Sequence, residues 1–372
     1  MLIFATAAAL ALTGEWGLEY GQLIPYATPG FVAFGVGAIP AGWLADRWSR
    51  QGMMTIFFFG IGASAIFAGL VNSPLQMSIA LTFVGIFAAI YHPVGLALVV
   101  QGRERTGLPL AINGIYGNMG VACAALLTGF FIDIAGWRLA FIVPGVLSIF
   151  AGFGFIGANR RARREGAQVP KTKPAQHGWS RKSLLRIFAV VLVTTGLGGL
   201  IFQSTTFALP KVFDERLGEF ATSASAVGGY AFVVFTLAAF AQLLVGFLVD
   251  RYSIRLVFAL VASMQAIFLF AMTLFSGFAT LLIALAFMLA VFGQIPINDV
   301  LVGRIAKSEW RARAYALRYV VTFSVMASAV PLIGWIHGSW GFDLLFPLLS
   351  LAALLILAAV LALPGRIEPS TG

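Results

Sequence analysis

Long apolar runs, repeated along almost the whole chain, constrain this sequence more than any other feature. Eleven runs are predicted as helices near residues 24–45, 52–71, 76–100, 108–132, 139–158, 184–209, 223–249, 255–275, 278–300, 314–336 and 342–363. Hydrocarbon offers no hydrogen-bond partners to a polypeptide backbone, and a helix needs about 20 apolar residues to cross it. Only 10% of the residues are charged, against about 25% in soluble domains. The chain is therefore predicted to be an all-α, multi-pass membrane protein.

The first 13 residues are apolar but too few to span a bilayer. As a helix they would reach about 20 Å, at about 1.5 Å per residue, against a hydrocarbon core of about 30 Å. No basic residue precedes them, so a secretory signal fits poorly. We expect these residues to be the outer part of a first helix whose beginning is missing from the sequence.

Basic residues alternate between the two sides of the predicted helices. Most of the 24 lysines and arginines fall at 47–50, 103–105, 160–186, 251–255, 304–313 and 366. The positive-inside rule places these segments and the C-terminus in the cytoplasm, and a bacterial inner membrane is the expected location. The net charge of +10 then follows from topology. We therefore expect contact with the lipid bilayer and no nucleic-acid partner.

A polar, basic, proline-containing stretch divides the chain into two halves. Such a stretch cannot bury apolar area, so it is predicted to be a linker. The expected parts are an N-terminal bundle with a partial first helix and five further helices at 1–158, a cytoplasmic linker at 159–183, a six-helix C-terminal bundle at 184–363 and a cytoplasmic tail at 364–372.

The same short motif follows a helix in each half. "GWLADRWSRQ" begins at Gly42 and "GFLVDRYSIR" begins at Gly246, with Gly, Leu, Asp, Arg and Ser at the same relative positions. Parallel repeats related by an axis along the membrane normal produce this arrangement. Two pseudo-symmetric six-helix bundles are therefore expected.

The first motif resembles the signature loop of the major facilitator superfamily, commonly written G-x-L-a-D-R-x-G-R-[RK], between the second and third helices of that fold. The matching residues are Gly42, Leu44, Ala45, Asp46, Arg47 and Arg50, and the weaker echo between helices eight and nine matches at Gly246, Asp250 and Arg251. Ser49 and Gln51 depart from the pattern. The resemblance implies the two-bundle fold of that family and secondary transport by alternating access of the rocker-switch type.

Two further pairs of stretches look like facilitators of the drug-efflux and fosmidomycin-resistance type. They are "AIYHPVGLALV" with "NGIYGNMGVA", and "QIPINDVLVGR" with "RARAYALRYV". This loose resemblance names no substrate.

The repeated motif is predicted to act as a gate. Gly42 has no side chain, so a helix of the other half could approach closely. Asp46 would then face the N-terminus of a helix from that half, whose unpaired amides and dipole favour an anion. Arg47 and Arg50 can pair with nearby carboxylates. Because these contacts require the cytoplasmic ends to be together, they would favour the outward-open state.

Polar residues inside the spans are candidates for a substrate path, because each is costly in hydrocarbon. The resemblance implies that helices one, four, seven and ten line the cavity, and helix five offers further polar residues. The candidates are Tyr91, His92, Asn113, Tyr116, Asn118, Gln203, Gln294 and Asn298. For His92, a satisfied interhelical hydrogen bond is the alternative interpretation. For the Ser and Thr residues at 204–206, backbone hydrogen bonding is the simpler one.

Asp299 and Arg318 are predicted to form a buried charge pair. Asp299 lies near the cytoplasmic end of one span, and Arg318 lies one or two turns into the next span from the same side. Burying either charge alone would cost free energy, so a mutual salt bridge is the simpler interpretation. A direct role toward substrate or protons is the alternative.

Catalytic, metal and cofactor chemistry is not indicated. Cys123 is the single cysteine, and the three histidines lack metal-ligand spacing. No convergent nucleophile and base suggest an enzyme. We expect a monomeric, gradient-driven transporter of a small organic solute, with coupling protons as a further ligand. The alternative is a non-transporting membrane sensor or assembly factor of the same fold, which should tolerate loss of His92 and of the Asp299–Arg318 pair.

Overall fold

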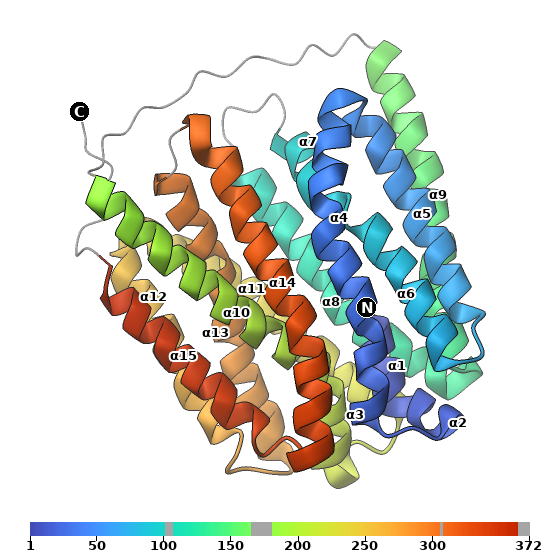
Figure 1. Ribbon diagram of the computed structural model, residues 1–372. Coiled ribbons are helices and arrows are strands. Elements are labelled where there is room, and N and C mark those ends of the chain that lie inside the picture. The colour runs from blue at the N-terminus through green and yellow to red at the C-terminus, as the bar shows by residue number, and fades with distance from the viewer. Residues whose placement is uncertain (101–106, 165–180, 306–307, 364–372) are drawn as a thin grey trace.

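The computed structural model describes residues 1–100, 107–164, 181–305 and 308–363, and the regular elements in this part of the chain are all helices (Figure 1). The first half contains α1 (Leu2–Ala7), η1 (Ala8–Leu12), α2 (Thr13–Trp16), α3 (Tyr20–Leu23), η2 (Ile24–Ala27), α4 (Thr28–Arg47), α5 (Arg50–Gly69), α6 (Pro74–Ala88), η3 (Tyr91–Gly95), α7 (Leu96–Val100), α8 (Gly107–Ala135) and α9 (Trp137–Arg164). The second half contains α10 (Arg181–Arg216), η4 (Gly218–Phe220), α11 (Ala224–Arg251), α12 (Ile254–Ala271), α13 (Phe278–Ile305), α14 (Ser308–Trp340) and α15 (Leu345–Leu361).

The helices have the length and composition of membrane spans. Within the described ranges, ten helical segments are long and apolar enough to cross a bilayer, and Leu2–Trp16 and Leu345–Leu361 are shorter apolar helices. Each of the eleven predicted spans coincides with one of these segments, which confirms the all-α, multi-pass fold class. The central part of the predicted linker, 165–180, and the predicted tail, 364–372, lie outside the described residues.

Local chemistry explains where the helices begin and end. Ser49, Ser73 and Ser223 precede α5, α6 and α11, and each hydroxyl accepts a hydrogen bond from a backbone amide of the first helical turn. This contact satisfies a donor that has no partner within the helix. Gly136 and Gly277 lie in turns between consecutive helices with φ of 89° and 62°, a conformation that glycine adopts without steric cost.

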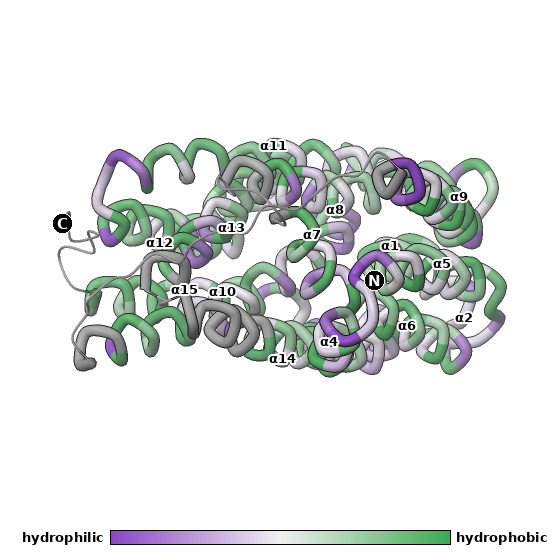
Figure 2. The backbone as a smooth tube through the Cα atoms, turned by 90° about the horizontal axis from the view of Figure 1, so that it is seen from above, coloured by the Kyte–Doolittle hydropathy of each residue, from purple (hydrophilic) through white to green (hydrophobic). Residues whose placement is uncertain are grey.

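The helices run along one common direction, so the molecule has two ends. We call the end at the top of Figure 1 the linker end, because α9 finishes there at Arg164 and α10 starts there at Arg181. The opposite end, where α8 finishes and α11 begins, is called the far end. Seen along the helices, the second half of the chain lies on the left of Figure 2 and the first half lies on the right. Most positions in both halves are hydrophobic.

The two groups touch closely at the far end, where α8 of the first half crosses α11 of the second. A Cβ atom at Gly129 would lie 2.2 Å from the carbonyl oxygen of Ala224, and one at Gly228 would lie 2.5 Å from that of Ala125. Both distances are too short for any side chain. Glycines therefore bring the two backbones into direct contact, as small residues do between membrane helices.

A second close contact joins the halves at the far end. A Cβ at Gly21, in α3, would lie 2.6 Å from the carbonyl oxygen of Gly334, in α14, and one at Gly334 would lie 2.7 Å from that of Gly21. Two separate helix pairs thus join the halves at this end.

Toward the linker end, α8 and α11 approach each other less closely. A Cβ at Gly114 would have its nearest neighbour, Oε1 of Gln242, at 3.9 Å. The helix pair is therefore in backbone contact at the far end and in looser, side-chain contact near Gly114.

Candidate functional site

The helix that carries Tyr91 and His92 changes geometry at these residues. The α-helical turns of α6 give way to the π-helical turn η3, Tyr91–Gly95, before α7 continues. Pro93 lies inside this turn and has no amide hydrogen to donate, so the regular hydrogen-bond ladder cannot pass through it. Single π-helical turns are frequent at functional sites. The local sequence therefore positions two predicted path residues on irregular backbone.

Tyr91 is joined to the neighbouring helix α8. Its hydroxyl lies 2.6 Å from Oδ1 of Asn113 and donates a hydrogen bond to it, and its ring packs on Phe57 with the ring centroids 5.5 Å apart. Both Tyr91 and Asn113 are half-buried. The other candidates on α8 do not join this pair: Tyr116 is 75% exposed, and Asn118 is half-buried one turn further along.

His92 lies where the two halves meet. Its ring is 5.6 Å from that of Phe34, on α4, and 5.5 Å from that of Phe323, on α14 of the other half. The two phenylalanine rings are 4.4 Å apart. Asp299 also interacts electrostatically with His92. The structure thus brings this predicted path residue against an aromatic pair that bridges the halves.

Arg318 and Asp299 form an ion pair between α14 and α13. The Arg318 side chain is 10% exposed, whereas that of Asp299 is 47% exposed. The guanidinium is therefore shielded while its carboxylate partner remains accessible. The structure brings together the two charges that the sequence pairs.

Gln294 and Asn298 belong to a buried polar network inside the second half. Oγ1 of Thr194 lies 3.0 Å from Oδ1 of Asn298, and Nε2 of Gln294 donates to the carbonyl oxygen of Thr194 at 3.0 Å. Nε2 of Gln265 donates to Oε1 of Gln294 at 2.8 Å. All four residues are buried. Both predicted path residues thus take part in hydrogen bonds that join α10, α12 and α13.

Gln203 presents a different environment on α10. It is 3% exposed, and within the described part of the chain its Nε2 has no hydrogen-bond partner. One helical turn further along, Phe207 packs on Phe31 of the first half with centroids 5.7 Å apart, so this face of α10 is directed toward the other half. Thr205 and Thr206 bond to carbonyls of their own helix. Gln203 therefore keeps an available amide near the interface.

The first motif, which is predicted to act as a gate, has its described contacts within the first half. Oδ1 of Asp46 accepts a hydrogen bond from Arg50 at 2.8 Å, and both side chains are exposed. A Cβ at Gly42 would meet Pro93 of its own half at 3.3 Å. Among the described residues, no contact joins Asp46 to the other half. In this state Asp46 is paired within its own segment.

The other motif residues lie at the same end. The Arg47 guanidinium lies over the ring of Trp43, 5.0 Å from its centroid, and that of Arg251 lies 4.2 Å from the ring centroid of Phe247. Leu44 and Asp250 are exposed. These arrangements leave both motifs accessible at the linker end.

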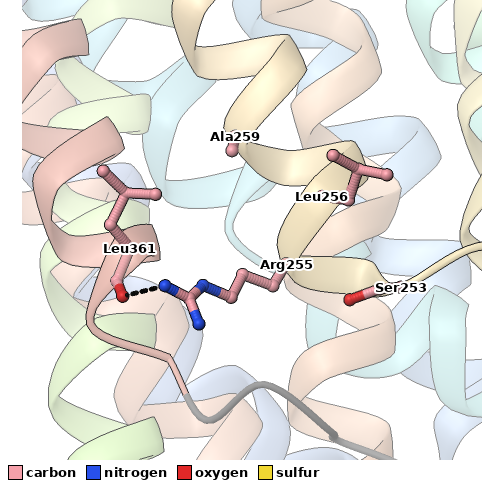
Figure 3. Close-up of a pocket in the computed structure, with 5 residues that line it drawn as sticks. All are labelled: Ser253, Arg255, Leu256, Ala259 and Leu361. Atoms are coloured by element: carbon pink, nitrogen blue, oxygen red, sulfur yellow. Dashed lines mark hydrogen bonds between the residues drawn. The ribbon is translucent and has the colours of Figure 1, made fainter.

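A small pocket lies apart from these residues, between the linker ends of α12 and α15 (Figure 3). Its volume is about 220 Å³, and its lining comprises Ser253, Arg255, Leu256, Ala259 and Leu361. The Arg255 guanidinium donates to the carbonyl oxygen of Leu361 at 2.7 Å. A cation at a helix C-terminus satisfies carbonyls that lack partners. The pocket therefore accompanies a helix cap, away from the predicted path.

Four neighbours of the path residues were not predicted from the sequence: Thr194, Gln265, Phe34 and Phe323. Thr194 and Gln265 are polar residues in apolar spans, so the criterion used for the other candidates could have found them. Phe34 and Phe323 carry no such signal, because the chain contains 34 phenylalanines.

A family model decides the relationship of the chain to known proteins. The model described as "Major Facilitator Superfamily" matches residues 1–219 and again residues 217–371. The chain belongs to the major facilitator superfamily. This membership confirms the family resemblance over both halves, whereas the finer drug-efflux type stays a prediction.

The chain is also similar to individual transporters. It is 27% identical to a probable hexose phosphate transport protein of Chlamydia pneumoniae over 42% of this chain and 34% of the relative. It is 28% identical to the 4-hydroxybenzoate transporter of Pseudomonas aeruginosa over 38% of this chain and 32% of the relative. The chain thus matches about a third of the length of these curated relatives. Their names confirm the expectation of a transporter family over an enzyme family.

Solved structures share the fold over nearly the whole chain. A D-xylose-proton symporter superposes with a TM-score of 0.71 at 16% identity, covering 99% of this chain and 96% of that one. An inward open conformation of the Escherichia coli xylose transporter gives a TM-score of 0.71 at 14% identity, covering 100% of this chain and 94% of that one. These similarities confirm the two-bundle fold.

Proposed function

We propose that this superfamily member is a monomeric secondary transporter that moves a small organic solute by alternating access. The observation that carries the proposal is the unequal contact between the halves. Backbones touch at Gly129 and Gly228 at the far end, whereas nearer the linker end the nearest atom to a Cβ at Gly114 is a side-chain atom of α11, Oε1 of Gln242, at 3.9 Å. Contact between the halves that is tighter at one end than at the other is what one state of an alternating-access cycle requires.

We further propose that the linker end faces the cytoplasm of a bacterial cell, as the basic residues predict. The state described here is then open toward the inside. The moving units are the bundles 1–158 and 184–363, and the linker 159–183 joins them. In the opposite state, the linker ends would come together and Asp46 could exchange Arg50 for a partner in the other bundle.

The proposed solute is a small organic acid. Relatives are named for hexose phosphate, 4-hydroxybenzoate, gallate and L-galactonate, and these compounds are anions at neutral pH. Arg318 is the residue proposed to bind the anionic group, because its guanidinium is shielded and so attracts a carboxylate or phosphate more strongly than in water. His92 and Gln203 would contact the rest of the solute.

Proton coupling follows from the same ion pair. A solute anion that binds Arg318 competes with Asp299 for the guanidinium, and a proton carried with the anion would keep the net charge of the site unchanged. One proton and one anion would then cross together. The driving force is a proton gradient.

Uptake by proteoliposomes tests this function. The panel contains 4-hydroxybenzoate, gallate, L-galactonate, a hexose phosphate and D-xylose, each with and without an imposed proton gradient. We expect gradient-dependent accumulation of at least one acid. Accumulation of D-xylose alone would overturn the acid assignment, and no gradient-dependent accumulation of any compound would overturn the proposed function for this panel. Arg318→Gln should abolish acid uptake, and Arg138→Gln, at the far end, should retain it.

A further inference from the structure

One carboxylate at the far end bridges the two bundles. Asp133, in the last turn of α8, accepts hydrogen bonds from two backbone amides of α11: Ala224 to Oδ1 at 3.2 Å and Ser225 to Oδ2 at 2.7 Å. Both oxygens of the side chain are used. The residue that supplies them belongs to the first bundle, and the amides belong to the second.

These two amides are among the donors that a helix leaves without a partner at its N-terminus. The hydroxyl of Ser223 accepts from the amide of Ala226, so the second bundle satisfies that donor itself. The amides of Ala224 and Ser225 instead depend on Asp133. The negative charge also lies at the positive end of the α11 dipole. Parting the far ends therefore removes both hydrogen bonds and a charge–dipole attraction.

The ion pairs described at this end, in contrast, each lie within one bundle. Asp343 pairs with Arg216 at 3.0 Å within the second bundle. Glu215 lies 3.0 Å from His337 in the same bundle, and Glu15 pairs with Arg138 within the first. Asp133 differs from them because its contact is lost whenever the bundles separate at the far end.

The direct contact of the helices places Asp133 at the required position. Gly129 lies one turn before Asp133 on α8, and a Cβ there would clash with the carbonyl oxygen of Ala224. Any larger residue would hold the N-terminus of α11 away from the carboxylate. Gly129 thus allows the close approach of α8 and α11, and Asp133 makes the hydrogen bonds that this approach permits.

We propose that Asp133 is a latch, a residue that holds the far ends of the bundles closed and so stabilises the state open at the linker end. The latch rests on the proposed alternating-access function, which gives closure a role. It acts at the opposite end from Asp46 and favours the opposite state. Asp133 is a positioning residue and does not contact the solute.

Distance measurements between spin labels test the latch without any solute. In a Cys123→Ser background, labels at Leu75 and Phe275 report on the far end, and labels at Trp48 and Tyr252 report on the linker end; all four side chains are exposed. Asp133→Ala should raise the ratio of far-end-open to far-end-closed molecules by roughly twofold to thirtyfold, the range for losing a helix-capping carboxylate. The linker-end distance should shorten in the same molecules.

Graded and control variants make the outcome decisive. Asp133→Asn keeps one acceptor oxygen and should give a smaller shift than Asp133→Ala. Asp343→Ala removes a far-end carboxylate that stays within one bundle, and both distance distributions should remain as in the wild type. Unchanged distributions in Asp133→Ala protein that elutes as a single folded species would overturn the latch. Shifted distributions without uptake of any panel solute would support the latch while removing the transport proposal.

Discussion

The hydroxyl of Tyr91 donates a hydrogen bond to Oδ1 of Asn113 at 2.6 Å, and this bond ties the π-helical turn η3 to α8. We expect Tyr91→Phe to lower the rate of solute uptake severalfold, because the loss of one hydrogen bond of about 1 kcal/mol frees the turn that presents His92. The measurement is initial uptake in proteoliposomes at matched protein content. Tyr116→Phe is the control, since Tyr116 is exposed, and it should retain the wild-type rate. Equal rates for both variants would contradict this role.

Asp299→Asn should abolish proton-driven accumulation of the solute without abolishing its movement across the membrane. The variant cannot take up a proton at this side chain, so a proton gradient should no longer drive accumulation. Exchange of labelled for unlabelled solute needs no net proton transfer and should persist. Counterflow and gradient-driven uptake are measured in the same vesicles. Glu219→Gln, at an exposed carboxylate of the far end, should keep both activities. Gradient-driven accumulation by Asp299→Asn at the wild-type level would rule out Asp299 as the coupling group.

Gln265→Leu should destabilise the protein by about 1–3 kcal/mol, because Oε1 of Gln294 and the carbonyl oxygen of Ala290 both lose a donor inside the second bundle. The matched control is Gln242→Leu, since among the described residues Nε2 of Gln242 donates to a carbonyl of its own helix, that of Ala239. Thermal unfolding of the purified protein in one detergent provides the comparison. A loss of stability no larger than that of the control would show that the network contributes little.

Gly228→Ala should weaken the far-end contact. The added methyl group would lie 2.5 Å from the carbonyl oxygen of Ala125, whereas a Cβ at the adjacent Gly229 would have no described atom within 4 Å. We expect Gly228→Ala to open the far end, seen as a longer distance between labels at Leu75 and Phe275. Gly229→Ala should leave that distance unchanged. The same distance in both variants would mean that the helices can shift to accept the methyl group.

Accessibility in intact cells tests which end faces the cytoplasm. A cysteine at Tyr252, at the linker end, should resist a membrane-impermeant thiol reagent, and one at Phe275, at the far end, should react. Both positions are exposed in loops, and Cys123→Ser supplies the background. Labelling at Tyr252 with protection at Phe275 would reverse the proposed orientation.

Periodic and long-range features differ in how far the sequence could predict them. The helices follow from runs of apolar residues, since a backbone in hydrocarbon has few alternatives. The pairing of Asp299 with Arg318 follows from the cost of either charge alone. The partner of Asp46 could not be predicted, because it depends on which end of the path is open. The contact of Asp133 with α11 depends on how two distant helices cross, and no local pattern records that crossing.

The sequence predicts the π-helical turn and the polar network only in part. Pro93 indicates an interruption but does not specify a wider turn. Gln294 and Asn298 are recognisable as polar residues inside spans, but the sequence does not show whether such side chains bind a solute or one another. Their shared partner is set by the packing of α10 against α13, which brings Thr194 within hydrogen-bond distance of both.

The network of Thr194, Gln265, Gln294 and Asn298 has a consequence for how motion is shared between the bundles. It crosslinks three helices of the second bundle through hydrogen bonds that would be costly to break in a dry interior. That bundle should therefore rotate as a rigid body. The first bundle contains the irregular turn at Pro93, so it supplies the hinge at which a helix can bend. Alternating access in this protein would then be mechanically asymmetric: the second bundle would move as a rigid body, and the first would bend near the solute.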